Sequence, residues 1–167
     1  ARLREACPTL WDGRFKVITE FGRYIHANAA WCATRIEYVK PFEGGANLIV
    51  HAGADMFLRE CYNPGDWFHH MTVIDAEGQT IAGQSDTSYH IAGPLCFGGD
   101  FIDKGRQLPP AKPGDRLIIA DVGANTFSLW SKHCSRAFPK VIGYSAPDGE
   151  DLHILKKRES LEDVIAF

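Results

Sequence analysis

The sequence lacks blocks of like charge, long apolar runs, internal repeats and low-complexity segments. Its 18 basic and 21 acidic residues are interspersed and give a net charge of -3. This argues against a nucleic-acid or anionic-membrane partner, because both require clustered Lys and Arg. No apolar run is long enough to cross a bilayer. With 167 residues and 45% hydrophobic content, the chain is large enough to bury the core of a single domain.

The cysteines show no pairing pattern. The five cysteines are an odd number, lie far apart and form no CxxC pair: Cys7, Cys32, Cys61, Cys96 and Cys134. Neither a disulfide framework nor a zinc site is indicated, so we expect no metal and a reducing, cytoplasmic compartment. No signal peptide is visible, and the chain begins in mid-pattern, as expected of a piece of a longer protein.

Short strands separated by turn residues dominate the pattern. Helical spacing is confined to residues 1–10, 55–62, 126–133 and 160–167, with Asp55 and Ser160 as N-cap candidates and Asp163 completing a capping box. The predicted strands are 15–20, 24–39, 47–51, 68–74, 80–82, 87–92, 117–120, 141–144 and 152–155, with a turn at 147–149. Such spacing predicts a mainly β sandwich or barrel with a few short helices.

Three loops carry residues suited to chemistry. Residues 93–100, with the sequence GPLCFGGD, hold Cys96 in a bend rich in glycine, where the thiol either faces a ligand or is merely buried. Glu20 and Arg23 flank a glycine at the end of a predicted strand, as a ligand anchor or as a surface ion pair. Residues 121–125 follow a strand and open a helix, which suits anion binding but also suits a plain turn.

In their order along the chain, these segments resemble the C-terminal part of the pyridoxal-phosphate decarboxylases of the diaminopimelate, ornithine and arginine decarboxylase family. The family's Glu-Pro-Gly-Arg motif is matched by residues 20–23 and its Gly-Pro-x-Cys-acid-x-x-Asp motif by residues 93–100. Its Asp-x-Gly-Ala-Tyr motif is matched by residues 121–125, and its closing Arg-Arg-Glu-Thr-x-Glu-Asp segment by residues 157–163. Each motif is weak singly, but four in order make a specific match over nearly the whole chain.

The resemblance implies a fold and a division of the chain. In this family a (β/α)8 barrel binds the cofactor, and a following β-domain closes the site. Residues 1–23 would be the last helix and strand of such a barrel. Residues 24–167 would form the β-domain, a Greek-key-like barrel or sandwich of the alanine racemase C-terminal type.

The resemblance also implies roles for single residues. Glu20 would lie against the pyridine nitrogen of pyridoxal 5'-phosphate and keep it protonated. Arg23 would hold the phosphate, and Asn125, at the position of the family's tyrosine, would add one weaker hydrogen bond. Cys96 would reach into the partner's site of a head-to-tail homodimer and reprotonate the substrate carbon as a general acid.

Other positions depart from the family pattern and bear on the substrate. Phe97 stands where the family has an acidic residue that meets a distal amino group, so we expect a less basic or more apolar amino acid than ornithine, lysine or diaminopimelate. Asp100 closes the same motif and is assigned to substrate binding with Phe97. Arg59 and Tyr62 match, with altered spacing, a segment that helps to hold substrate carboxylates.

The lysine that forms the Schiff base lies, in the family, on an early barrel strand, and no motif for it occurs in this sequence. We therefore expect the 167-residue chain to be inactive alone. Two other functions stay open. One is a non-catalytic β-barrel that binds a ligand or regulates a partner. The other is a thiol enzyme with Cys96 as nucleophile and His90 or His133 as base.

Two further groups of residues have ordinary structural interpretations. Adjacent residues on a strand point to opposite faces, so His69 and His70 predict one paired core histidine and one exposed histidine instead of a metal site. Trp31, Trp67 and Trp130 are interpreted as core or interface residues, not as stacking platforms.

Overall fold

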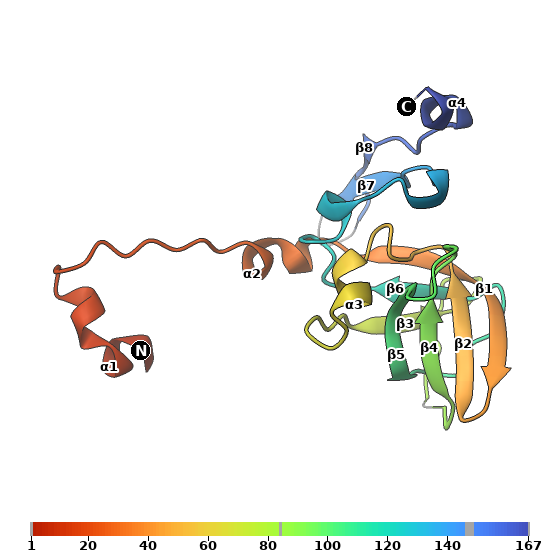
Figure 1. Ribbon diagram of the computed structural model, residues 1–167, viewed down its shortest axis with the longest axis horizontal. Helices are drawn as coiled ribbons and strands as arrows, with labels where there is room; N and C mark the ends of the chain where they lie inside the picture. Colours follow the sequence, from red (N-terminus) through yellow and green to blue (C-terminus); the bar gives the residue numbers. More distant parts are fainter. Residues whose placement is uncertain (1, 84, 146–148, 167) are drawn as a thin grey trace.

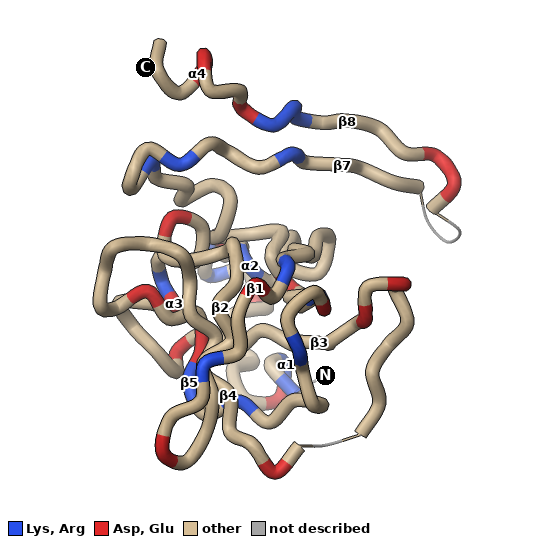
Figure 2. Tube along the Cα trace, turned by 90° about the vertical axis from the view of Figure 1, so that its right-hand side faces the viewer, with Lys and Arg blue, Asp and Glu red and all other residues tan. Residues whose placement is uncertain are grey.

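The computed structural model consists of a curled β-sheet domain with an arm at its N-terminus and a β-hairpin at its C-terminus (Figure 1). The structure describes residues 2–83, 85–145 and 149–166. Basic and acidic residues are interspersed along the trace (Figure 2). Among the described helices, none is both long and apolar enough to span a membrane.

The main sheet has six strands in the order β3-β6-β1-β2-β4-β5, and only β2 and β4 pair in parallel. It curls into an open half-barrel, which confirms the predicted mainly β fold with few short helices. Its strands are β1 (Cys32–Phe42), β2 (Gly45–Val50), β3 (Met71–Ile74), β4 (Ser88–Ala92), β5 (Phe101–Gln107) and β6 (Arg116–Ile119).

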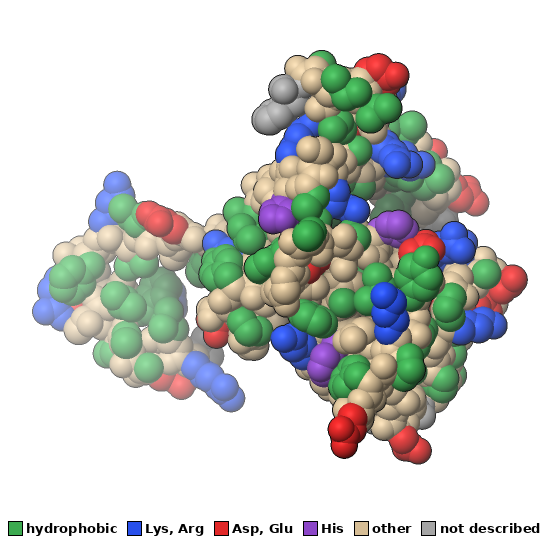
Figure 3. Space-filling model, turned by 45° about the vertical axis from the view of Figure 1, so that its right-hand side comes forward, with side chains coloured by type: hydrophobic (Ala, Val, Ile, Leu, Met, Phe, Trp, Pro, Cys, Tyr) green, Lys and Arg blue, Asp and Glu red, His purple; other side chains and the backbone are tan. Residues whose placement is uncertain are grey.

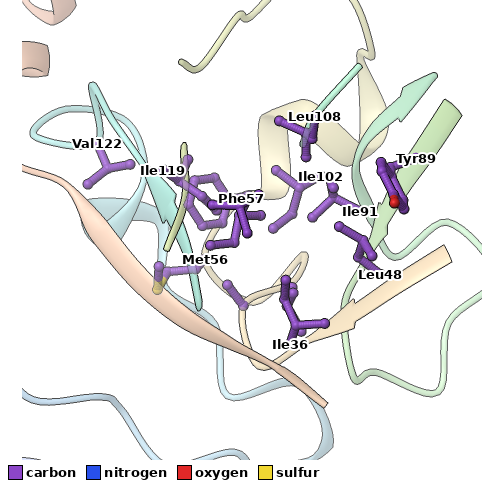
Figure 4. Packing of buried hydrophobic residues seen from close by; sticks show 14 of the residues in the cluster. Ile36, Leu48, Met56, Phe57, Tyr89, Ile91, Ile102, Leu108, Ile119 and Val122 are labelled. Carbon is purple, nitrogen blue, oxygen red and sulfur yellow. The ribbon is translucent and has the colours of Figure 1, made fainter. Parts of the chain in front are cut away.

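The core lies inside the curl, where alternate strand residues point inward. Every second residue of β2 and of β6 is buried, as the period of two along a strand requires. Six strand residues have no exposed surface and pack in one cluster with Phe57, from the loop before helix α3 (Leu58–Tyr62): Ile36, Leu48, Val73, Ile91, Leu117 and Ile119 (Figure 4). Helix α3 itself packs on β5.

The edge strands β3 and β5 share no backbone ladder among the described residues, and one side chain spans the opening. Arg106 of β5 donates a hydrogen bond to the carbonyl of His69, just before β3, and its guanidinium lies 4.2 Å from the centre of the Phe68 ring. This side chain ties the two edges together where the backbones do not pair.

A buried ion-pair geometry confirms the prediction for the two histidines. His69 is 2% exposed, and its Nε2 lies 2.8 Å from Oε1 of Glu60, which is also 2% exposed, while His70 is exposed. The other ring nitrogen of His69 lies 2.8 Å from the Ala120 carbonyl, so it must donate. The imidazole and the carboxyl group are thus each other's buried partner.

The N-terminal arm differs from the expectation. It contains α1 (Arg2–Ala6) and the 3₁₀-helix η1 (Pro8–Trp11), followed by residues 12–22 without a helix or strand. The predicted strand 15–20 is wrong because the segment has no partner strand among the described residues. The predicted strand 24–39 starts only at Cys32, since α2 (Arg23–His26) and η2 (Ala27–Ala29) precede it. Apolar side chains of the arm lie on its surface (Figure 3).

The C-terminal part begins with two 3₁₀-helices, η3 (Phe127–Leu129) and η4 (His133–Ser135), in place of the predicted helix 126–133. Strands β7 (Val141–Tyr144) and β8 (Leu152–Lys156) form a separate hairpin beside the sheet domain in both views (Figures 1 and 2). Helix α4 (Leu161–Ile165) follows and has the predicted capping box. The predicted turn at 147–149 lies mostly outside the described residues.

Two smaller predictions also fail, and one strand was missed. Residues 80–82 form only an isolated bridge between Ile74 and Thr80 instead of a strand. Strand β5 directly follows the cysteine bend and was not predicted, because Gly105 interrupts its pattern. Asp55 does not cap α3, whose N-cap is Phe57, because the Asp55 carboxylate binds an arginine from a distant loop.

Candidate functional site

The bend at residues 93–100, called here the cysteine loop, is closed by the carboxylate of its last residue. Asp100 is 4% exposed and accepts hydrogen bonds from the N–H groups of Leu95 at 2.7 Å and Ala54 at 2.6 Å. A Cβ at Gly93 would lie 2.3 Å from the Asp100 carboxylate, so only glycine fits there. The loop therefore folds over Asp100 and leaves Cys96 and Phe97 exposed.

Burial raises the pKa of the Asp100 carboxyl group, although the N–H donors of Leu95 and Ala54 oppose that effect. Both carboxylate oxygens are engaged by backbone donors within the domain. In this structure Asp100 therefore shapes the loop. Its predicted contact with a substrate stays a prediction.

The turn at residues 53–55, called here the anchoring turn, binds a second loop as well as the cysteine loop. This second loop is residues 131–136, called here the histidine loop. Arg136 donates from Nε to the buried Asp55 carboxylate at 2.6 Å, and the Ser131 N–H donates to the Asp55 carbonyl at 3.0 Å. The two loops meet where the rings of Phe97 and His133 lie 6.3 Å apart, centre to centre. Sequence gives no signal for this meeting.

Two predicted anion-binding arginines converge on one indole ring. The guanidinium of Arg23 lies 4.4 Å from the centre of the Trp67 ring, and that of Arg59 lies 5.1 Å from it. Neither arginine forms an ion pair with a carboxylate among the described residues, and Nη1 of Arg23 is buried without a hydrogen-bond partner there. Trp67 thus packs against two arginines of its own chain, and its predicted role as a core or interface residue stays a prediction.

Arg23 lines an open depression of about 550 Å³ together with Tyr24, Ala27, Asn28, Phe68 and Asp121. The loop 121–125 forms one side of it because it is bound to the segment after Arg23. The Gly123 N–H donates to the Ala27 carbonyl at 2.9 Å, and a Cβ at Gly123 would lie 1.9 Å from the His26 carbonyl oxygen. One residue of each resemblance motif, Arg23 and Asp121, therefore lies at the same depression.

The remaining predicted residues lie apart from this depression. Asn125 belongs to the same loop as Asp121 but does not line the depression, and its left-handed backbone has a φ of 59°, which asparagine tolerates. Glu20 is exposed on the arm, and Tyr62 is exposed at the end of α3. Cys96 and Phe97 are not among the residues that line the depression. The structure thus brings Arg59 to Arg23 through Trp67, keeps Cys96, Phe97 and Asp100 in the cysteine loop, and joins Glu20, Asn125 and Tyr62 to neither group.

The cysteines differ in accessibility. Burial raises the pKa of Cys32 and of Cys61 to about 12, which makes both thiols inert. Cys7, Cys96 and Cys134 are exposed. His90 is turned toward β5, where its Nδ1 accepts the Gly105 N–H at 3.0 Å. Among the described residues Cys96 has no histidine partner, and no group of three metal-ligating side chains gathers.

Comparisons with known proteins agree with these motifs. Residues 23–123, more than half of the chain, match the sequence model of the family described as "Pyridoxal-dependent decarboxylase, C-terminal sheet domain". The chain is 32% identical over 148 residues to diaminopimelate decarboxylase of Helicobacter pylori, covering 89% of this chain and 34% of that protein. It is 31% identical over 153 residues to the enzyme of Neisseria meningitidis serogroup A, covering 92% and 35%.

Solved structures show the same fold. The crystal structure of diaminopimelate decarboxylase from Helicobacter pylori complexed with L-lysine matches with a TM-score of 0.77 and 29% identity over 95% of this chain and 36% of that one. A crystal structure of AQ1208 from Aquifex aeolicus matches with a TM-score of 0.79 over 99% of this chain and 39% of that one, at 22% identity. The chain spans about a third of the length of the curated relatives. It belongs to the family of pyridoxal-dependent decarboxylases and carries their C-terminal sheet domain.

Proposed function

We propose that this chain acts as the C-terminal domain of a pyridoxal-phosphate-dependent amino-acid decarboxylase and contributes residues to sites shared across a homodimer. The observation that carries the proposal is the packing of the 121–125 loop against α2, which brings Asp121 of one family motif to the depression that Arg23 of another lines. In this proposal residues 1–23 belong to the cofactor-binding barrel. The 167-residue chain alone is inactive because it lacks the lysine motif.

The residues around the depression fit the phosphate of the cofactor. The Arg23 guanidinium lies over the Trp67 ring, and a guanidinium in such a contact still has N–H donors for an anion. Its Nη1 is desolvated and without a partner among the described residues, so an incoming phosphate would satisfy it. Arg23 would hold the phosphate with help from the Asn125 amide, and Glu20 would hold a proton on the pyridine nitrogen.

When bound, the cofactor supplies an electron sink for the charge left on the substrate carbon as CO2 departs. The protein must then deliver a proton to that carbon. The Cys96 thiol lies exposed in a loop that the Asp100 carboxylate closes, which suits a general acid. Because Cys96 does not line the depression beside Arg23, we assign it to the site of the partner subunit. Arg59, with Tyr62, would bind a carboxylate of the substrate.

The test uses the full-length protein. We expect it to bind pyridoxal phosphate, as followed by absorbance, and to release CO2 from an amino acid such as diaminopimelate, the substrate named in its relatives. The 167-residue chain should release none. Arg23→Ala should weaken cofactor binding about 10- to 100-fold through loss of a charge-assisted contact. Arg35→Ala, an exposed arginine on β1, is the matched control and should change it less than about twofold.

The alternative is a non-catalytic ligand-binding or regulatory module, which the changes at Phe97 and Asn125 favour. The full-length protein could bind the cofactor or another small molecule and release no CO2 from any amino acid. That result would support the non-catalytic module and contradict the proposed decarboxylase function. CO2 release by the 167-residue chain itself would contradict the proposed division of the site.

A further inference from the structure

The face formed by Cys96 and Phe97 contains a third side chain that comes from a distant part of the sequence. His133 is exposed, and its ring is tilted by 45° against the Phe97 ring at 6.3 Å. Phe97 is 47% exposed, so neither ring is part of the hydrophobic core. A thiol, a phenyl ring and an imidazole are therefore presented by two adjoining loops.

Both loops are fixed to the anchoring turn by buried carboxylates. Asp100, in the cysteine loop, accepts the Ala54 N–H, and Asp55, in the turn, accepts Arg136 of the histidine loop. These carboxylates are 4% and 1% exposed. Buried, charge-assisted hydrogen bonds of this kind hold a loop more firmly than exposed ones do. The relative position of Phe97 and His133 is thus set by the fold instead of by loop motion.

The same arrangement removes negative charge from the exposed face. Asp100 and Asp55 point inward, and the family's acidic position is occupied by Phe97. Glu159, which approaches the histidine loop, is paired with Lys132 at 3.1 Å and accepts the Phe138 N–H at 2.8 Å. No described carboxylate is paired with His133. A distal ammonium on a substrate would find no compensating charge here, whereas an acceptor would find an imidazole N–H donor.

We propose that His133 is a specificity-determining residue of the site, and that it selects an amino acid whose side chain ends in a hydrogen-bond acceptor such as a carboxylate. Phe97 contacts the methylene groups of that side chain, and the imidazole N–H of His133 donates to its terminal oxygen. This inference rests on the proposed decarboxylase function and names the substrate class for it.

The test compares two probes of similar length in the full-length protein with cofactor: 2-aminoadipate, which ends in a carboxylate, and lysine, which ends in an ammonium. Wild type should have the higher kcat/KM for 2-aminoadipate. His133→Ala should lower that value about 10- to 100-fold, the effect of one hydrogen bond to a charged group, and change the value for lysine less than about twofold. The loss should lie mainly in KM.

Two further variants separate recognition from a structural role. His133→Gln keeps an N–H donor and should recover part of the activity toward 2-aminoadipate. His153→Ala removes an exposed histidine on β8 and should leave the ratio of the two kcat/KM values unchanged. Equal loss for both probes in His133→Ala, or a wild-type preference for lysine, would overturn the role of His133 and leave the decarboxylase standing. No CO2 from any amino acid would overturn the proposed function, and this inference with it.

Discussion

The sheet domain and the N-terminal arm have similar shares of apolar residues, but the sheet domain buries many of these side chains and the arm exposes them. In the sheet, Ile36 and Leu48 have no exposed surface, whereas Ile18 on the arm is 73% exposed and Phe15 is 61% exposed. A curled sheet buries alternate residues against itself, but a single extended segment has no second layer to bury them. Apolar patterning therefore becomes a core only where tertiary structure supplies a partner surface. This is consistent with our assignment of residues 1–23 to a barrel.

The largest effect should come from breaking the buried pair inside the sheet domain. Glu60→Ala leaves the buried His69 ring without its carboxyl partner, and we expect the free energy of unfolding to fall by about 3–5 kcal/mol. Urea titration of the 167-residue chain measures this. His70→Ala, on the exposed neighbour, should cost no more than about 0.5 kcal/mol. Equal losses for the two variants would show that Glu60 and His69 do not form the pair in solution.

A pair of isoleucines compares the two regions directly. Ile36→Ala removes a side chain with no exposed surface from the centre of the sheet and should cost about 2–5 kcal/mol. Ile18→Ala makes the same chemical change on the arm and should stay within about 0.5 kcal/mol. Urea unfolding of both variants gives the difference. A loss at Ile18 close to that at Ile36 would mean that the arm packs on the sheet domain in solution.

The junction between the arm and the sheet domain offers a smaller perturbation. Gly123→Ala would place a Cβ 1.9 Å from the His26 carbonyl oxygen, so backbone must move, at a cost of about 1–3 kcal/mol. Gly98→Ala is the matched control, because a Cβ there meets no atom within 4 Å. Thermal unfolding should separate the two variants. If Gly123→Ala is as stable as Gly98→Ala, the 121–125 loop does not press on α2 and the depression beside Arg23 is not built as described.

Local patterns predicted much of the sheet. Strands β2, β4, β6, β7 and β8 were expected near their observed positions, and so was the capping box at Ser160, because a period of two and a cap are properties of neighbouring residues. The predictions of a strand on the arm and of a cap at Asp55 failed because both depend on partners distant in sequence. A strand requires a partner strand, and the Asp55 carboxylate binds the best donor in reach, which is Arg136.

The sequence by itself determined the family, the mainly β class and the four motifs, since these depend on the order and spacing of residues. Tertiary structure alone decided that Arg23 and Arg59 share the Trp67 ring, that Asp100 turns inward and that His133 joins Phe97. Those contacts join segments far apart in the chain, and their geometry depends on how the sheet curls and where its loops are anchored. No local pattern of residues encodes such a distance, because it is the folded backbone that sets it.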